Sequence, residues 1–385
     1  MSKLRADEAA ELSFPGPEMH AWLHGLREKG PVVEVPFAGE TAWLILSQTA
    51  LATAFKDERM FPAGEHYKRV LEPSQGPTFQ GREGREHHLL RSLATPAFRP
   101  RALRSWQDEL SPLAHEMVDR FVGEGRVDLV ERFTKIYPFL VISRMLGIPP
   151  EQEDQFHGWA TAMLRFDPEA NREFSEYMLP VMAERRRQPG DDVMSGLLHA
   201  EVDGRRFSDE EVLAHVRLLF SAGATTTFDA LGTLLFALLT HPDVLERVHS
   251  EEDALEKAVE ELFRWETPVA NLPRWTLGGG ELAGVEIPPQ SMLLFSITGA
   301  NHDPEFFTEP EVFDIDRDTR AKLTFGLGSH SCPGFHLARN ELVEATRVLL
   351  ERLPELQLED EEVAQPRGFA LRGSQSLPVS FRPGS

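Results

Sequence analysis

The stretch FGLGSHSCPG, from Phe325 to Gly334, holds the single cysteine of a 385-residue chain. Gly326, Gly328 and Gly334 permit a tight backbone around Cys332. The residues that follow have helical periodicity, so we expect the cysteine to lie just before a helix N-terminus. The helix dipole and the free amides of the first turn would stabilise a thiolate at that place.

A thiolate in a rigid loop is either a nucleophile or a metal ligand. A nucleophile needs a base and an orienting group; His330 and His336 are near in the sequence, but no oxyanion site is evident. A haem iron takes one thiolate as its proximal ligand, and its two propionates need cations. His87 and Arg91, four residues apart on one helix face, with Arg274 and His330, would supply them.

The longest apolar stretch predicts a core helix of about 32 residues. Ser208 followed by Glu211 fits a capping box at its start, and Thr240–Pro242 ends it. It is nearly long enough to span a bilayer, but Asp229 and three consecutive threonines favour a buried helix. We therefore expect no membrane segment.

Midway along this helix, AGATTT (Ala222–Thr227) combines a glycine with β-branched residues, which are poor helix formers. The threonine hydroxyls can hydrogen-bond to carbonyls four residues earlier. The small side chains would let a flat group approach the backbone.

Composition excludes several classes of protein. A net charge of −22 argues against nucleic acid as a partner. One cysteine excludes a disulfide framework and a multi-cysteine zinc site, and suits the reducing cytoplasm. The start of the chain has no apolar segment typical of a secretory signal.

The charge is uneven, because residues 80–104 contain six arginines and only two acids, Glu83 and Glu86. We call this segment the arginine-rich segment; its arginines are Arg82, Arg85, Arg91, Arg99, Arg101 and Arg104. Such a segment on an acidic protein predicts a docking surface or an anion site.

Helical patterns dominate from about residue 103 to 353. Residues 30–47 read as a β-hairpin, residues 285–304 as strand, turn and strand or short helix, and the tail from Gln365 as loop and strand. We predict a mainly α chain with small β-sheets (α+β), forming one domain over residues 1–385.

At this point the motifs match a family. FGLGSHSCPG fits, at every position, the haem loop F-G-x-G-x-H/R-x-C-x-G of the cytochromes P-450, which are haem-thiolate monooxygenases. ELFR (Glu261–Arg264) fits their E-x-x-R motif; residues 169–172 and 184–187 fit it too, but lie in the wrong place. Residues 300–317, 86–98 and 222–226 are similar to the family's meander, haem-contacting helix and oxygen-binding stretch. The chain resembles the family from about residue 10 to its end.

The resemblance implies a mainly helical fold with haem b between the long central helix and the helix after the cysteine loop. Cys332 would be the axial iron ligand, and Thr226 would hydrogen-bond dioxygen. Glu261 and Arg264 would form a buried pair that steadies the cysteine loop. The haem-binding positions would be His87, Arg91, Arg274, His330, Phe325, Gly326 and Gly334.

One position departs from the family pattern. The family usually has Asp or Glu immediately before the oxygen-binding threonine, and here that position is Thr225. Asp229 is the only carboxylate nearby on the helix. The proton relay would then run through Thr225 and water, or through Asp229.

The function expected from the resemblance is insertion of one oxygen atom from O2 into an apolar small molecule, by hydroxylation or oxidative dealkylation. No flavin or iron–sulfur signature is present, so electrons from NAD(P)H would arrive through a separate ferredoxin or flavodoxin and its reductase. Alternatives are a peroxide-driven peroxygenase, a haem sensor without turnover, and a cysteine hydrolase. A hydrolase would leave the other motifs unexplained.

The substrate is expected to be a terpenoid, steroid, fatty acid or aromatic, because the segments assigned to its pocket are mostly apolar. These segments are the loop before His87, residues 163–182 and the turn at residues 369–371. The individual candidates are Leu219, Ala222, Gly223, Val269 and Leu272.

Overall fold

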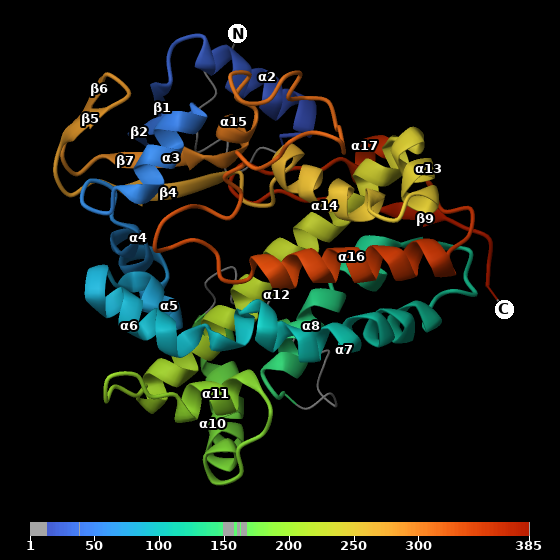
Figure 1. Ribbon diagram of the computed structural model, residues 1–385, viewed down its shortest axis with the longest axis horizontal. Helices are drawn as coiled ribbons and strands as arrows, with labels where there is room; N and C mark the ends of the chain where they lie inside the picture. The colour runs from blue at the N-terminus through green and yellow to red at the C-terminus, as the bar shows by residue number, and fades with distance from the viewer. Residues whose placement is uncertain (1–13, 38, 149–157, 160–161, 163–167, 385) are drawn as a thin grey trace.

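Helix α12 (Asp209–Thr240) crosses the centre of the computed structural model, and other helices pack around it (Figure 1). The structure describes residues 14–384 apart from residues 38, 149–157, 160–161 and 163–167. The predicted capping box is confirmed: Ser208 Oγ accepts the Glu211 amide at 3.2 Å, and the Glu211 carboxylate accepts the Ser208 amide at 2.8 Å. The helix also ends at Thr240, as its sequence predicts.

Helices make up most of the described chain, as predicted. The α-helices are α2 (Gly16–Arg27), α3 (Gln48–Lys56), α4 (Ala63–Val70), α5 (Glu72–Gln75), α6 (Gly84–Ala94), α7 (Pro100–Asp119), α8 (Tyr137–Met145), α10 (Pro168–Arg187), α11 (Val193–His199), α12, α13 (Pro242–Ser250), α14 (Ala254–Trp265), α15 (Ile297–Asn301), α16 (Phe335–Arg352) and α17 (Glu361–Ala364). Short 3-10 turns η1 (Phe79–Gly81) and η2 (Pro96–Phe98) and a π-helical turn η3 (Val130–Thr134) complete them.

The strands form small sheets. They are β1 (Val32–Phe37), β2 (Glu40–Ile45), β3 (Arg126–Asp128), β4 (Asn271–Trp275), β5 (Gly280–Leu282), β6 (Val285–Ile287), β7 (Met292–Ser296), β8 (Gln357–Leu358) and β9 (Pro378–Ser380). The largest sheet has the order β1-β2-β7-β4. Its β1–β2 pair is the predicted hairpin, with Val35 opposite Ala42.

Strand β4 lies at one edge of this sheet, antiparallel to β7, with Leu272 opposite Phe295. An edge strand tolerates Pro273, which has no amide to donate to a ladder. Because side chains alternate along a strand, Leu272 and Arg274 share one face. Both line the cavity described below, so the sheet edge positions an apolar and a cationic side chain together.

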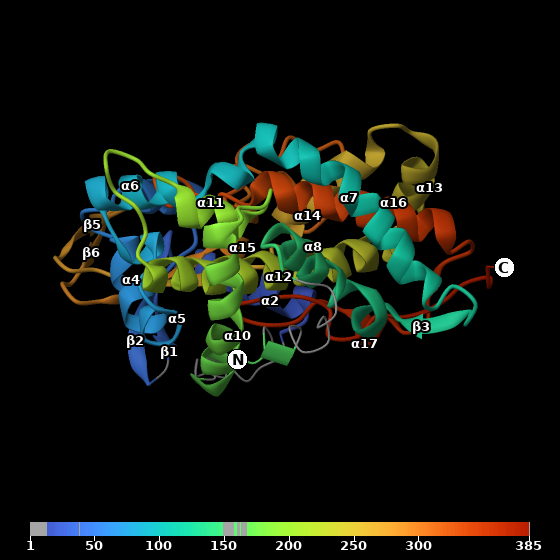
Figure 2. The same cartoon turned by 90° about the horizontal axis from the view of Figure 1, so that it is seen from below.

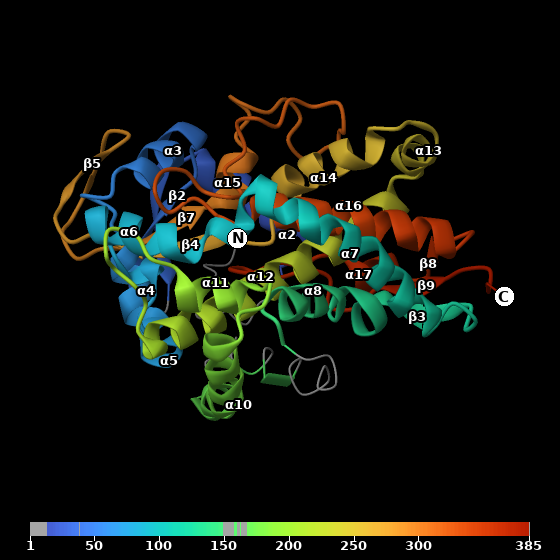
Figure 3. The same cartoon turned by 60° about the horizontal axis from the view of Figure 1, so that its bottom comes forward.

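The helical part has layers. Helices α16 and α7 lie side by side in all three views, and α8 packs on α12 (Figures 1, 2 and 3). The sheet of β1, β2, β4 and β7 lies at the other end of the molecule, beside α3 (Figure 1). The cysteine loop, residues 325–334, leads directly into α16 of the helical part.

Helix α12 is long and apolar enough to cross a membrane, but 72% of its most apolar 18-residue window is buried within the protein. The description as a core helix is therefore confirmed. The start of the chain, for which we expect no secretory signal, and residues 163–167 of the predicted substrate segment lie outside the described residues.

Candidate functional site

The cysteine loop is tightly folded. Gly326 and Gly328 have φ values of +66° and +76°, a region that favours glycine. A Cβ on Gly328 would lie 3.0 Å from the carbonyl oxygen of Phe55. The Cys332 amide donates to the Phe325 carbonyl at 2.8 Å, which closes the loop. Gly326 and Gly328 therefore permit the tight backbone that the sequence predicts around Cys332.

Cys332 lies directly before α16, as predicted, and its exposed surface lines an internal cavity. Protein surrounds the sulfur, so burial raises the pKa of the Cys332 thiol despite the opposing effects of the Gly334 and Phe335 amides and of Arg91. The amides at the start of α16 favour the thiolate, as predicted, but the desolvation of the sulfur outweighs their effect on the pKa. A bound metal cation would reverse the balance.

The cavity has a volume of about 270 Å³ and lies between α12, the cysteine loop and β4. Most of the predicted site residues line it: Arg91, Arg274, His330, Cys332, Phe325, Gly326, Gly334, Thr226, Leu219, Ala222, Gly223, Val269 and Leu272. Phe79 and Gln80, from the loop before His87, line it as well. Predicted site residues that lie far apart in the sequence therefore line the same cavity.

Some predicted positions do not reach the cavity. Residues 168–182 and 369–371 are absent from its lining in the described chain. Phe369 instead packs in an aromatic cluster with Phe14, Trp22 and Phe37. For Phe369 the substrate-pocket prediction is wrong, because this side chain packs in the aromatic cluster instead; for the other positions it stays a prediction.

Two guanidinium groups face the cavity. Arg274 is buried and stacks over the ring of Tyr67 at 5.2 Å. Arg91 donates to the Ser331 carbonyl at 2.6 Å, which ties α6 to the cysteine loop. Within the described chain neither has a carboxylate within ion-pair distance, so both retain positive charge to offer an anion.

His87 and His330 stack face to face, with ring centroids 3.9 Å apart. Nε2 of His330 lies 3.4 Å from a Glu83 oxygen but is not aligned for a hydrogen bond, and both ring nitrogens of His87 are buried without a partner. Burial lowers the pKa of His87 to about 3. His87 is therefore a neutral hydrogen-bonding group in this structure, and its role as a propionate partner stays a prediction.

The side chains of the three consecutive threonines in α12 point in different directions. Thr226 and Thr227 line the cavity, whereas Thr225 is buried away from it. The predicted back-bonds are present: Thr225, Thr226 and Thr227 donate to carbonyls four residues earlier at 3.1, 3.2 and 2.9 Å. A side chain at position 225 thus points away from the cavity.

Asp229 also lies outside the cavity. Its carboxyl packs against the backbone of Gly373, where a Cβ would come within 2.3 Å of it. Burial raises the pKa of this carboxyl well above its usual value. The alternative in which Asp229 relays protons to Thr226 is not supported by this placement, because the next turn of the helix faces the C-terminal segment.

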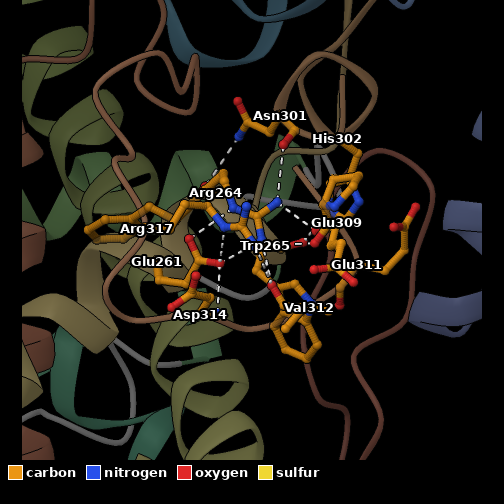
Figure 4. A network of polar contacts seen from close by, with 12 residues as sticks. Glu261, Arg264, Trp265, Asn301, His302, Glu309, Glu311, Val312, Asp314 and Arg317 are labelled. Carbon is orange, nitrogen blue, oxygen red and sulfur yellow. Dashed lines mark hydrogen bonds and ion pairs between the residues drawn. The ribbon is translucent and has the colours of Figure 1, made fainter. Parts of the chain in front are cut away.

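Glu261 and Arg264 are fully buried, and two hydrogen bonds of 2.9 and 2.6 Å join them (Figure 4). Arg264 also donates to the carbonyls of Asn301, Pro310 and Val312. Arg317 donates to Glu261 at 3.2 Å from the other side. The pair therefore fixes α14 to the segment 308–317.

The connection from this pair to the cysteine loop runs through Asn301, which the sequence analysis missed. Asn301 Oδ1 accepts the Leu323 amide at 2.8 Å, and its Nδ2 donates to Thr324 Oγ1 at 2.9 Å. Thr324 in turn donates to the Phe263 carbonyl of α14. The chain just before Phe325 is thereby anchored.

Glu341, on α16, is a second residue that sequence reasoning missed. It is buried and lines the cavity, and one of its oxygens has no hydrogen-bond partner. Burial raises the pKa of this carboxyl well above its usual value. An acid in helical register with apolar Ala345 and Val348 is the signal that would have revealed it.

The arginine-rich segment separates into parts with different surroundings. Arg82 is paired with Glu72 and Glu86 at 3.1 and 3.2 Å, and Arg91 faces the cavity. Exposed Arg101 and Arg104 border a surface groove of about 670 Å³, together with residues of α16. Arg85 and Arg99 are exposed as well, so four of the six arginines lie on the surface.

Comparison with known proteins decides the family. The family model for cytochrome P450 matches residues 156–367, more than half of the chain. The chain belongs to the cytochrome P450 family. The P450 fold class predicted from sequence is confirmed, as is the class of enzyme, a haem-dependent monooxygenase.

Several P450 relatives span almost the whole chain. The polyketide biosynthesis cytochrome P450 PksS of Bacillus subtilis is 32% identical, covering 95% of this chain and 97% of its own. The 6-deoxyerythronolide B hydroxylase of Saccharopolyspora erythraea is 32% identical over 92% and 94%. The solved structure of CYP109Q5 from Chondromyces apiculatus superposes with a TM-score of 0.90 at 32% identity, over 95% and 96%.

The residues of the cavity fit the haem that P450 enzymes carry. A thiol lines the cavity, two guanidinium groups face it, and a buried imidazole lies beside them; in the part of the chain that the structure describes, the guanidinium groups have no acidic partner and the imidazole nitrogens have no hydrogen-bond partner. These are the groups that an iron ligand and two propionates require.

Proposed function

We propose that this P450 inserts one oxygen atom from O2 into an apolar small molecule and that separate redox proteins supply its electrons. O2, two electrons, two protons and the substrate C–H bond give a hydroxylated product and water. The observation that carries the proposal is the cavity itself, in which the Cys332 thiol and the Thr226 hydroxyl share a space with an apolar wall. Leu219, Val269 and Leu272 belong to that wall.

When bound, the haem supplies the iron at which O2 is reduced and an oxygen atom is transferred. Cys332 would hold the iron, and Arg91 and Arg274 would bind the propionates. Thr226 would hold a water molecule or the dioxygen within hydrogen-bond reach. The small side chains of Ala222 and Gly223 leave room for a flat group beside α12.

The apolar wall would orient the substrate and exclude bulk water from the reacting atoms. Relatives support a substrate with a large carbon skeleton, since their names include a 6-deoxyerythronolide B hydroxylase and a vitamin D(3) 25-hydroxylase. A solved neighbour contains corticosterone. A terpenoid, steroid, fatty acid or aromatic therefore remains our proposed class.

The electron route is proposed as NAD(P)H, a reductase, and a ferredoxin or flavodoxin. Exposed Arg101 and Arg104, on a protein with a net charge of −22, support an acidic donor at the groove beside α16. We propose a cytoplasmic location as well, together with a single domain over residues 1–385.

A peroxide-driven reaction is the second candidate. One observation favours it: neither Thr225 nor Asp229 presents a group to the cavity, so the usual carboxylate beside Thr226 has no substitute on α12. Peroxide brings its own protons and electrons and would make that carboxylate unnecessary.

One experiment separates the two candidates. The holoprotein is incubated with substrate and either isotopically heavy O2 plus NAD(P)H, ferredoxin and reductase, or unlabelled hydrogen peroxide. The proposal predicts heavy oxygen in the product and a much slower reaction with peroxide. Product formed only with peroxide would replace the monooxygenase proposal by the peroxygenase.

A further inference from the structure

The cavity wall between α4 and α6 is formed by a short segment, residues 72–81, which contains α5 and the turn η1. Its Phe79 and Gln80 line the cavity. Only four residues of the segment form α5 and three form η1, so little regular structure holds it. What fixes its position is therefore a set of side chains from the neighbouring helices.

His215 of α12 makes the first contact. The Phe79 amide donates to Nε2 of His215 at 3.1 Å, and Nδ1 lies 2.6 Å from the Glu211 carbonyl. A nitrogen beside a carbonyl must carry the proton, so Nε2 is free to accept. Burial lowers the pKa of His215 to about 4, which keeps it in this neutral form near pH 7.

Aromatic packing holds the same imidazole in place. The ring of Phe207 lies 4.3 Å from it and that of Phe79 lies 5.7 Å from it, centroid to centroid. His215 is fully buried. It therefore cannot rotate to another partner without losing both stacking contacts.

Arg217, two residues further along α12, makes the second contact. Its Nη1 donates to the Gln75 carbonyl at 2.8 Å, and its Nε donates to Ser175 Oγ on α10 at 3.1 Å. Within the described chain no carboxylate lies within ion-pair distance of Arg217. One guanidinium thus joins α12 to α10 through Ser175 and to the segment 72–81 through Gln75.

Gly76 allows this close approach. Its φ is +87°, and a Cβ there would lie 3.1 Å from Cβ of Ala214 and 3.4 Å from Nη1 of Arg217. Gln75 adds a third contact, since its Nε2 donates to Ser221 Oγ at 3.4 Å. The segment is therefore seated on α12 at several points immediately beside the cavity.

We infer that His215 and Arg217 are positioning residues that latch residues 72–81 onto α12 and so set the size and access of the substrate cavity. They touch neither the substrate nor the cofactor; they act through Phe79 and Gln80. The inference rests on the proposed function only in taking this cavity as the one that receives the substrate.

Hydrogen–deuterium exchange of the holoprotein tests the latch without any turnover. His215→Leu removes the acceptor of the Phe79 amide, and Arg217→Met removes the donor to Gln75. Because a neutral hydrogen bond is worth about 1 kcal/mol, exchange in residues 76–81 should accelerate about fivefold in His215→Leu, and at least as much in Arg217→Met, which loses a charged donor. His215→Gln, which can still accept, should restore most of the protection of the Phe79 amide.

Thr233→Val is the matched control, because Thr233 is buried on α12 and its hydroxyl bonds within the helix at 2.8 Å, away from the cavity. It should leave exchange in residues 76–81 unchanged. Unchanged exchange there in both latch variants, or an equal increase in all variants over the whole chain, would overturn the latch. If His215→Leu does not fold, Arg217→Met carries the same comparison.

A second readout uses imidazole and 4-phenylimidazole, which bind haem iron whatever the natural substrate is. Loss of the latch should raise the association rate of the bulky phenyl compound several-fold and that of imidazole much less. Equal effects on both compounds would contradict a role in access. A holoprotein that binds both compounds but oxidises no substrate would instead contradict the proposed function and leave the exchange result standing.

Discussion

Thr226 tests the chemistry at the scale of one residue. Its hydroxyl lines the cavity, so Thr226→Ala should divert electrons from product to hydrogen peroxide, lowering the product formed per NAD(P)H by at least about tenfold. Haem content and substrate affinity should change little, since a single hydroxyl is lost. The measurement is product and peroxide per NAD(P)H consumed.

Thr225→Val and Asp229→Asn are matched controls, because both side chains lie outside the cavity. Both should retain wild-type coupling. Unchanged coupling in Thr226→Ala would remove this threonine from the mechanism and favour the peroxide-driven reaction.

Asp229 also predicts a pH dependence of stability. Burial raises the pKa of its carboxyl in the folded chain, so the folded state holds a proton that the unfolded state releases above its pKa of about 3.9. Stability must then fall as the pH rises from there toward the folded pKa.

Asp229→Asn removes this loss. The free energy of unfolding of Asp229→Asn, measured in urea and compared with that of wild type, should therefore be higher at pH 8 than at pH 5. An identical difference at both pH values would show that Asp229 is ionised in the folded protein.

Site residues that belong to a motif with distinctive spacing could be predicted from the sequence. Residues whose role depends on the direction in which the side chain leaves a helix could not. Cys332 and Arg91 follow from the sequence because the loop and the helix face have distinctive spacing. Thr225 and Asp229 are adjacent to Thr226 in sequence, yet their side chains leave the helix in other directions. Glu341 was missed because its burial depends on how α16 packs.

At the scale of elements, the Glu261–Arg264 pair joins α14 to the segment 308–317 and, through Asn301, to the cysteine loop. Among the described residues, Arg264→Met would leave buried Glu261 with Arg317 as its one cationic partner. We expect the free energy of unfolding to fall by about 3–5 kcal/mol, as for other broken buried pairs. Urea unfolding measures it.

Arg264→Lys is the informative companion. Lysine keeps the charge but cannot bond both carboxylate oxygens and three carbonyls at once, so it should recover less than half of the loss. A loss below about 1 kcal/mol in Arg264→Met would mean that the pair is dispensable for the fold.

Elements with a local signal were predicted well. The hairpin β1–β2 and the boundaries of α12 follow from turn residues and caps, which act within a few residues. The sheet β3-β9-β8 was not predicted, because it pairs residues 126–128 with residues 378–380 near the other end of the chain. Such pairings depend on tertiary packing that short segments do not encode.

The whole molecule carries a strongly negative charge with a local exception at the groove beside α16, where Arg101 and Arg104 are exposed. Charge reversal, Arg101→Glu with Arg104→Glu, should slow reduction by an acidic ferredoxin or flavodoxin about tenfold at low salt and flatten the salt dependence. Stopped-flow reduction at several ionic strengths measures this.

Arg82→Glu is the control for that prediction, because it reverses a charge of the same arginine-rich segment at a position that does not line the groove beside α16. It should change the reduction rate much less. A rate and salt slope untouched by the double reversal would place donor docking elsewhere on the surface.

The central claim is that the one thiol of the chain holds the iron of the one haem. The most direct measurement is the visible spectrum of the reduced carbon monoxide complex, recorded for wild type and Cys332→Ser. Wild type should show the absorption of thiolate-ligated haem, and the variant should lose it together with monooxygenase turnover, because serine offers no thiolate. An unchanged thiolate-type spectrum in Cys332→Ser would contradict the account.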